Sequence, residues 1–371
     1  MRISPFLLER HFAKYEFDIP FQLSCSDCEP LALAELLEMA STESIGLWQN
    51  LKLSYTESQG NTLLREEISQ TYDGIKPEEI IVCAPEEGIF LVMNSLLSSG
   101  DHLIVISPAY QSLSEIALSI GCQVSHWKAD LDGQYRVKSM ESLITSKTRM
   151  VVINFPHNPT GALISRAEFI EITQLCTLNG ILLFSDEMYR GLEQDISYQL
   201  PCAAALSPGN ISLSGMSKSF ALPGLRIGWL VCRNPGVREE LIQMKDYTTI
   251  CASAPSEILA IIALKNRDRI LKRNLQIIKK NIIMVNEFID RNTDCVYWNE
   301  PKAGSVALLN LLNGLSSEEL CKDLLEKQKV LAIGSHLFRF HEPAIRLGLG
   351  RIGFEQALKK LEDYLFSVVK S

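Results

Sequence analysis

Short apolar runs rich in β-branched residues recur along the first two thirds of the chain, and helical stretches separate several of them. Uniformly apolar runs of this length are typical of strands buried on both faces, and strands that alternate with helices usually pair in parallel. The sequence therefore predicts an α/β fold organised around a largely parallel sheet. The runs lie at residues 80–83, 103–106, 150–154, 181–185 and 226–232.

The sequence pattern changes at about Pro255. Residues 257–290 carry a nearly unbroken helical pattern, and residues 297–312 and 344–348 have the character of strands, with helices between them. This order of elements predicts a second, smaller α+β domain.

The length of 371 residues also favours two domains, because it is long for one hydrophobic core and short for three. We expect a large domain at residues 41–254. The small domain would combine residues 255–371 with residues 1–40, which we expect to pack, with their helical run at 31–39, against that domain rather than form one of their own.

Composition limits the possible partners and compartments. Apolar residues make up 46 % and charged residues 22 % of the chain, and no apolar run is long enough to span a membrane. The first residues have too short an apolar run to form a secretory signal, so we expect a soluble, cytoplasmic protein. A net charge of −8 without clustered Lys and Arg argues against nucleic acid as a partner.

The ten cysteines are scattered without regular spacing. This pattern favours reduced, mostly buried thiols over a disulfide framework. Cys25 and Cys28 form one C-x-x-C pair, but no second pair or nearby histidine completes a tetrahedral metal site. We therefore expect no bound metal.

One lysine lies in a segment with an unusual set of neighbours. In residues 215–228, GMSKSFALPGLRIG, Lys218 is surrounded by small residues and Arg226 follows it by eight positions. Small residues let a bulky ring approach the backbone, and a guanidinium fork binds phosphate oxygens in pairs. The pattern indicates a lysine that holds an aldehyde and an arginine that holds a phosphate.

Further candidate residues follow the carboxyl ends of the predicted strands, which is where open α/β sheets bind ligands. Asp186 closes the run at 181–185, and its carboxylate could pair with a protonated pyridine nitrogen. Tyr189 and Asn158 could donate hydrogen bonds to a phenolic oxygen, and Tyr110 could stack on a ring. Taken singly, these residues also suit a helix cap, a turn or ordinary packing.

Two more features suggest anion binding. The strand at 80–83 runs into a helix, whose amino end could receive a phosphate through its free N–H groups. Arg346 is a charge inside an apolar strand, and such a charge needs an anionic partner. A substrate carboxylate would serve.

In this order and spacing, the motifs resemble those of the class I and II aminotransferases, which share the aspartate aminotransferase fold. The resemblance runs through nearly the whole chain and implies a three-layer large domain with a mostly parallel sheet, a smaller α+β domain and pyridoxal 5'-phosphate as cofactor. It implies that Lys218 forms the internal aldimine and moves the proton, and that Asp186 pairs with the pyridine nitrogen. Tyr189 and Asn158 would hold the phenolic oxygen, and Tyr110 would stack on the ring.

The resemblance also implies the reaction and the partners. An L-amino acid would pass its amino group to the cofactor and leave as a 2-oxo acid, and a second 2-oxo acid would then accept the group. Arg346 would bind the substrate's α-carboxylate, with Asn158 beside it. Tyr55 is similar to the tyrosine that reaches the neighbouring subunit's cofactor phosphate, which implies a homodimer.

The chain departs from the family pattern at the phosphate. Ala84-Pro85 stands where Gly-Ala or Ser-Gly is usual, and Pro85 has no N–H to donate. Gly215 replaces a serine that binds phosphate in many relatives. Phosphate binding would then depend on Glu86, Arg226 and Ser217.

Other functions remain open. The same residues serve elimination by a lyase and oxygen-dependent oxidation of arginine-like amino acids, and the family also includes non-catalytic modules of transcription regulators. The spacing G-x-G-x-x-G at residues 348–353 suits a dinucleotide site. Only eighteen residues follow it, too few for a second strand and an acidic ribose ligand, so we expect a strand end and a helix cap there.

Overall fold

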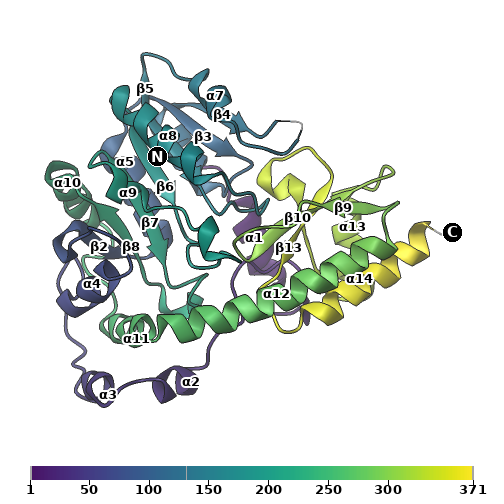
Figure 1. Cartoon of the computed structure of the whole chain (residues 1–371), viewed down its shortest axis with the longest axis horizontal. Helices are drawn as coiled ribbons and strands as arrows, with labels where there is room; N and C mark the ends of the chain where they lie inside the picture. Colours follow the sequence, from purple (N-terminus) through teal and green to yellow (C-terminus); the bar gives the residue numbers. More distant parts are fainter. Residues whose placement is uncertain (1, 131, 370–371) are drawn as a thin grey trace.

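The computed structural model describes residues 2–130 and 132–369 (Figure 1). Its main sheet has seven strands in the order β2-β8-β7-β6-β5-β3-β4. Only β8 runs antiparallel to its neighbours in this sheet, which confirms the predicted, mostly parallel sheet. The strands are β2 (Ile80–Cys83), β3 (His102–Ser107), β4 (Gln123–Lys128), β5 (Thr148–Asn154), β6 (Leu182–Asp186), β7 (Asn210–Gly215) and β8 (Gly228–Cys232).

Helices cover both faces of this sheet, as the alternation of side chains along β3 demonstrates. Leu103 and Val105 belong to one buried cluster, whereas Ile104 and Ile106 belong to another on the opposite face. The first cluster is completed by α5 (Pro85–Leu96), α6 (Ser112–Ile120) and α10 (Pro235–Lys245), and the second by α7 (Val137–Glu141), α8 (Arg166–Leu178) and α9 (Ala203–Leu206).

The region predicted as one nearly unbroken helix is two helices, α11 (Ala254–Lys265) and α12 (Arg267–Arg291). At Asn266 the backbone leaves the helical region (φ −112°, ψ 19°), and the side-chain amide donates to the Ile262 carbonyl at 2.9 Å. Asparagine competes with a helix backbone in this way, so it separates the two. Around the β2 edge, α11 packs against α2 (Leu33–Glu38), α3 (Thr42–Gln49) and α4 (Thr62–Ser69).

A second sheet lies at the far end of α12 (Figure 1). It is antiparallel, with the order β12-β13-β10-β9. Its strands are β9 (Val296–Trp298), β10 (Val306–Leu311), β12 (Ile333–Gly334) and β13 (Ala344–Gly348), and α13 (Ser317–Asp323) and α14 (Phe354–Val369) are the longer helices beside it.

The amino-terminal residues contact both halves of the molecule. The strand β1 (Phe21–Gln22) pairs in parallel with β11 (Val330–Leu331), and α1 (Leu7–Tyr15) packs on the turn η5 (Ser335–Phe338) near the second sheet. By contrast, Leu36 of α2 is buried in the cluster at the β2 edge. The exact domain division at residues 40 and 255 stays a prediction. Further short helical turns are Pro77–Glu79, Ile196–Tyr198, Pro223–Leu225 and Leu324–Gln328.

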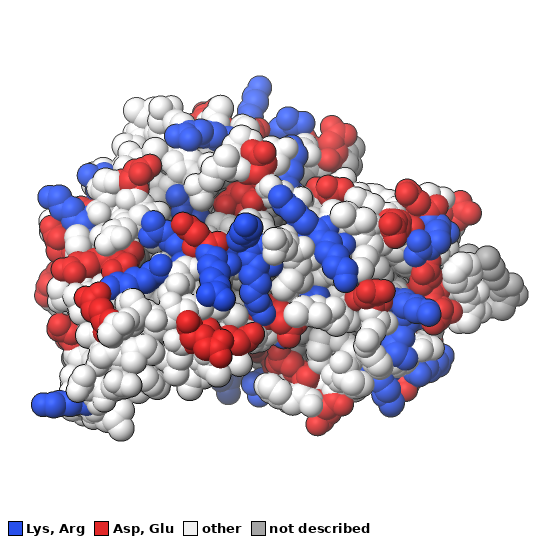
Figure 2. All heavy atoms as spheres, turned by 60° about the horizontal axis from the view of Figure 1, so that its bottom comes forward, with Lys and Arg blue, Asp and Glu red and all other residues white. Residues whose placement is uncertain are grey.

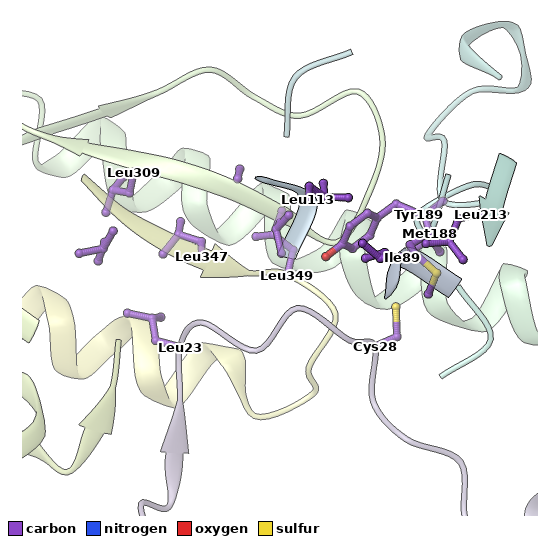
Figure 3. Close-up of a cluster of buried hydrophobic side chains, with 14 of the residues drawn as sticks. Leu23, Cys28, Ile89, Leu113, Met188, Tyr189, Leu213, Leu309, Leu347 and Leu349 are labelled. Atoms are coloured by element: carbon purple, nitrogen blue, oxygen red, sulfur yellow. The ribbon is translucent and has the colours of Figure 1, made fainter. Parts of the chain in front are cut away.

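One hydrophobic cluster joins the two sheets. Figure 3 shows Leu309 and Leu347 of the second sheet in line with Leu349, Tyr189 and Leu213, and all five belong to the same buried cluster. A shared core of this kind fixes the relative position of side chains that the two sheets contribute to one site.

The face turned forward in Figure 2 carries Lys and Arg across its middle, with Asp and Glu among them. Such a mixture is usual for a protein surface in contact with water. Among the described residues, no helix combines the length and the apolar character that crossing a membrane requires.

The glycine-rich segment at residues 348–353 packs against residues 23–29. A Cβ on Gly348 would lie 1.9 Å from the Cys25 carbonyl oxygen, and one on Gly350 would lie 2.7 Å from the Cys28 Cα. The Gly348 N–H donates to the Leu23 carbonyl at 2.8 Å. The spacing of these two glycines therefore follows from close backbone packing at the end of β13.

We accordingly expect Gly348→Ala to reduce the free energy of unfolding by at least about 3 kcal/mol, because backbone must move to admit the methyl group. Chemical denaturation of the two proteins measures the difference. Gly353→Ala is the matched control, since nothing lies within 4 Å of a Cβ at that position. Equal stability of the two variants would contradict the close packing described here.

Candidate active site

Lys218 follows the carboxyl end of β7 and points toward the amino-terminal segment. Its Nζ donates a hydrogen bond to Ser26 Oγ at 2.7 Å, across 192 positions of sequence. Burial lowers the pKa of the Lys218 amine, and the nearby Arg346 charge lowers it further, while Asp27 opposes the change. The environment thus favours the neutral amine, which is the nucleophilic and basic form.

Asp186 is the last residue of β6, and its side chain has no ion-pair partner within 4 Å among residues 2–130 and 132–369. Asp186 is only 7 % exposed. Its Oδ1 accepts a hydrogen bond from the Met188 N–H at 3.1 Å, and burial raises the pKa of the carboxyl to about 7. A cationic N–H placed beside this carboxyl would stabilise the ionised form.

Hydrogen bonds through Asn154 connect Asn158 to Asp186, and Tyr189 follows Asp186 by three residues. The Asn158 N–H donates to Asn154 Oδ1 at 2.8 Å, and Asn154 Nδ2 donates to the Asp186 carbonyl at 3.0 Å. Tyr189 Oη makes no hydrogen bond to any described residue. Burial raises the pKa of Tyr189, and the Arg346 charge and the nearby Ser26 hydroxyl oppose part of this rise. The neutral phenol is therefore available as a donor.

Arg346 lies in β13, in the middle of the second sheet, and is 1 % exposed. Its Nε and Nη2 donate to the Ser24 carbonyl at 3.2 and 2.7 Å, and Nη1 donates to Asn158 Oδ1 at 3.0 Å. All three contacts are with neutral acceptors, and no carboxylate of the described chain pairs with it within 4 Å. A buried guanidinium in this state is suited to an anionic ligand.

The contact between Arg346 and Asn158 joins the two sheets at the site. Asn158 follows β5 of the main sheet, whereas Arg346 belongs to the second sheet, 188 positions later. Tyr110 adjoins the same region: it is half-buried, and its Oη donates to Glu9 Oε1 of α1 at 2.6 Å.

The predicted phosphate residues are less closely assembled. Pro85 occupies the first turn of α5 as expected, and the Ser217 hydroxyl is buried without a hydrogen-bond partner among the described residues. Burial raises the pKa of Glu86 to about 7, and the charge of Arg226 partly opposes this. Arg226 itself is exposed and has a left-handed backbone (φ 54°).

Tyr55 lies away from all of these residues, between α3 and α4, and is 86 % exposed. No described contact joins it to Lys218 or Asp186.

A family model described as "Aminotransferase class I and II" matches residues 39–360, which is most of the chain. The chain belongs to the class I and II aminotransferases. It is similar to a pyridoxal-phosphate-dependent aminotransferase from Streptococcus suis, whose crystal structure it matches with a TM-score of 0.92, 28 % identity and coverage of 99 % of each chain.

Two further similarities bear on the reaction. An aspartate aminotransferase from Pyrococcus horikoshii is 27 % identical over 331 residues, which cover 85 % of this chain and 82 % of that protein. The crystal structure of a pyridoxal-phosphate-dependent cyclase, OrfR, matches with a TM-score of 0.89 and 25 % identity over 99 % of this chain and 98 % of that one. This aminotransferase is therefore an enzyme with pyridoxal phosphate as its cofactor, and the family includes relatives with other reactions.

The residues present fit this cofactor. A buried carboxyl without an ion pair, Asp186, suits a protonated ring nitrogen, and the unpartnered hydroxyls of Tyr189 and Ser217 are donors for the ring oxygen and the phosphate. Lys218 supplies an amine of lowered pKa.

Sequence patterns in this aminotransferase did not identify Ser24, Ser26 or Glu9, each of which contacts a predicted site residue. None lies in a chemical motif, and each meets its partner across more than 100 positions of sequence.

A separate cavity of about 680 Å³ opens beside α12. Its lining includes Tyr72, Arg190 and Lys272 but none of the residues predicted for the active site. The site around Lys218 is instead covered by residues 24–26 and by α1. We therefore identify it by the arrangement of its side chains and not by this cavity.

Proposed function

We propose that this aminotransferase moves an amino group from an L-amino acid to a 2-oxo acid, with Lys218 as the residue that bonds the cofactor's aldehyde carbon. The observation that carries this proposal is the convergence of three groups: the Lys218 amine, the unpaired Asp186 carboxyl and the Arg346 guanidinium. Lys218 follows β7 and Asp186 ends β6 in the main sheet, whereas Arg346 comes from the second sheet.

When bound, the cofactor supplies an electron-poor ring that delocalises the electrons left as a proton leaves the substrate's α-carbon. Asp186 holds the ring nitrogen in its protonated form by charge attraction. Tyr189 and Asn158 would hold the ring through its oxygen, and Tyr110 would pack against the ring. Lys218, with its lowered pKa, takes up the α-proton at Nζ and returns it.

The phosphate is assigned to Ser217, Arg226 and the first turn of α5 at Glu86. The Ser217 hydroxyl donates directly, and Arg226 provides the positive charge. A carboxyl with a pKa of about 7 takes up a proton beside a phosphate, so Glu86 acts there as a donor. Pro85 provides no N–H at this turn.

Arg346 binds the substrate's α-carboxylate with Asn158 beside it. We expect Arg346→Lys to raise KM for the amino acid by about 100-fold while changing cofactor binding little, because lysine keeps the charge but loses the paired donors. Steady-state kinetics and a cofactor titration measure the two effects. Arg291→Lys, at an exposed ion pair with Glu362, is the control; an unchanged KM in Arg346→Lys would refute the assignment.

The direct test of the proposed function adds amino acids one at a time to the cofactor-loaded protein. Loss of the visible absorbance with one amino acid, followed by its return with a 2-oxo acid, is the expected result. Release of ammonia or uptake of oxygen would instead identify a lyase or an oxidase. Formation of a ring would identify a cyclase, which is the alternative that the similarity to OrfR supports. If no amino acid reacts, the result would contradict the proposal and favour a non-catalytic module that only binds the cofactor.

We also propose a cytoplasmic homodimer in which Tyr55 reaches the partner subunit's cofactor phosphate. The exposure of Tyr55, which exceeds that of nearly every other large apolar side chain, supports this role. Analytical ultracentrifugation tests it, because a monomer at micromolar concentration would contradict the proposal.

A further inference from the structure

The amino-terminal helix α1 lies across the active site and is held at both sides. On the side of the main sheet, the Leu7 N–H donates to Gln111 Oε1 at 2.9 Å, and Gln111 Nε2 donates to the Pro5 carbonyl at 2.9 Å. On the side of the second sheet, Leu8 is buried against Ile333 and Phe338. The helix is therefore fixed between the two sheets and above the residues that they contribute.

One face of α1 is directed at the site. Glu9, Phe12 and Glu16 are spaced at i, i+3 and i+7, which places them on the same side of the helix. Phe12 lies 6.0 Å from the Arg346 guanidinium, measured to the ring centre, and Glu9 accepts the hydrogen bond of Tyr110. Phe12 thus lies near Arg346, and Glu9, one helical turn before Phe12, contacts Tyr110.

The charges at this face are not neutralised within the described chain. Neither Glu9 nor Glu16 has a cation within 4 Å, and Arg346 has no carboxylate within that distance. Asp27, a further acid near this face, is already paired with Arg351 at 2.9 Å. The site therefore has an unpaired positive charge at one end and unpaired negative charges at the other.

The electrostatic influence of Glu9 extends over the whole site. Burial lowers the pKa of Lys218 and of Arg346, and the charge of Glu9 is one of the smaller effects that oppose this change. Burial, Asp27 and then Glu9 raise the pKa of Glu16. A cation at this position would relieve the repulsion between the two glutamates.

We propose that the amino donor is a 2-amino acid with a cationic side chain, an amine or a guanidinium, whose charge meets Glu9 while its α-carboxylate meets Arg346. This inference rests on the proposed function. An acidic side chain would face two carboxylates, and Arg351, whose charge acts on Glu16, is already paired with Asp27. A neutral side chain would leave Glu9 without a counter-charge.

The alternative role for Glu9 is purely structural, as the acceptor that fastens α1 to Tyr110. Glu9→Gln separates the two roles, because an amide oxygen still accepts the Tyr110 hydrogen bond but carries no charge. Loss of substrate preference in this variant identifies the charge as the cause.

The first test compares L-arginine with L-citrulline, which has nearly the same shape without the charge. In the cofactor-loaded wild-type protein we expect kcat/KM for arginine to exceed that for citrulline by about 10- to 100-fold, the range for one hydrogen bond to a charged group. In Glu9→Gln the ratio should fall to within about 3-fold of unity. Glu38→Gln, an exposed carboxylate on α2, is the matched control and should keep the wild-type ratio.

A binding measurement supplies a readout that does not depend on turnover. Calorimetric titration of the Lys218→Ala protein with the same two amino acids should give the same order of affinity, and Glu9→Gln in that background should remove the difference. Glu9→Lys should reverse the preference toward L-glutamate over L-arginine.

The outcomes separate this inference from the proposed function. If methionine or glutamate reacts but arginine, lysine and ornithine show no advantage over neutral analogues, the cationic substrate is wrong and the aminotransferase reaction stands. If Glu9→Gln keeps the wild-type ratio of kcat/KM for arginine over citrulline, Glu9 serves only to hold α1 to Tyr110. That result would also overturn the inference. If no amino acid of any class reacts, the proposed function itself fails.

Discussion

Lys218→Ala is expected to abolish amino transfer, with kcat reduced by at least about 10⁴-fold, because one side chain bonds the cofactor and also moves the α-proton. The variant should still bind pyridoxal phosphate through Asp186, Ser217 and Arg226, but without a covalent bond. Borohydride reduction followed by mass spectrometry measures this bond directly: the wild-type chain should gain the mass of a phosphopyridoxyl group, which is the cofactor less water plus two hydrogens, on the peptide with Lys218. The variant should gain none.

The control for this experiment is Lys280→Ala. Lys280 is an exposed lysine of α12 that makes a long ion pair with Glu355 at 3.9 Å. It should retain both the activity and the labelled peptide. Labelling at any lysine other than Lys218, or turnover in Lys218→Ala above one part in a hundred, would remove the central assignment of this site.

Asp186→Asn is expected to have two opposite effects. Turnover should fall by about 10³-fold, because an amide cannot hold the ring nitrogen protonated. The cofactor-free protein should nevertheless become more stable at pH 8, since the substitution removes a buried negative charge that has no ion-pair partner. The amide oxygen can still accept the Met188 N–H.

The pH dependence of this stabilisation has a definite sign. Folding raises the pKa of Asp186 from 3.8 to about 7, so the folded protein binds more protons than the unfolded chain between those values. The contribution of Asp186 to stability therefore falls as pH rises from about 4 to above 7. We expect Asp186→Asn and wild type to be equally stable below pH 4, and the variant to be more stable by up to about 4 kcal/mol at pH 8.

Denaturant unfolding of the two cofactor-free proteins at pH 4, 6 and 8 measures this difference. With saturating pyridoxal phosphate the wild-type protein should become the more stable of the two. The cofactor's cationic nitrogen attracts the Asp186 carboxylate, and its attraction to an amide is weaker, so cofactor binding stabilises wild type more than Asp186→Asn. A stability difference that does not change with pH would contradict the raised pKa. A gain in stability that persists with the cofactor would contradict the contact with the ring nitrogen.

Five of the seven strands of the main sheet were predictable, because local patterns determine them, whereas β4 and β7 were not predicted from their more polar sequences. Uniformly apolar runs such as residues 103–106 are recognisable without any knowledge of their neighbours, and the predicted strands correspond to β2, β3, β5, β6 and β8 within two residues. The boundary between α11 and α12 at Asn266 was not predicted. The apolar periodicity of residues 257–290 continues across this single residue, whose side chain donates a hydrogen bond to the Ile262 carbonyl.

The same reasoning explains which site residues the sequence indicated. Asp186, Asn158 and Lys218 each follow a strand of a parallel sheet, and the carboxyl ends of such strands meet at one edge. Their side-chain chemistry then suggests a ring, an aldehyde and a proton to be moved. Their assigned roles stay proposals until the variants are measured.

The sequence by itself determined five of the seven strands of the main sheet, their order along the chain and candidate residues at their ends, because these depend on neighbours within about ten positions. Only the tertiary structure decided that Ser24 and Ser26 contact Arg346 and Lys218, and that Glu9 faces them from α1. Those contacts join residues separated by 101 to 322 positions. No local periodicity records such a pairing, since packing of the two sheets around a shared core creates it.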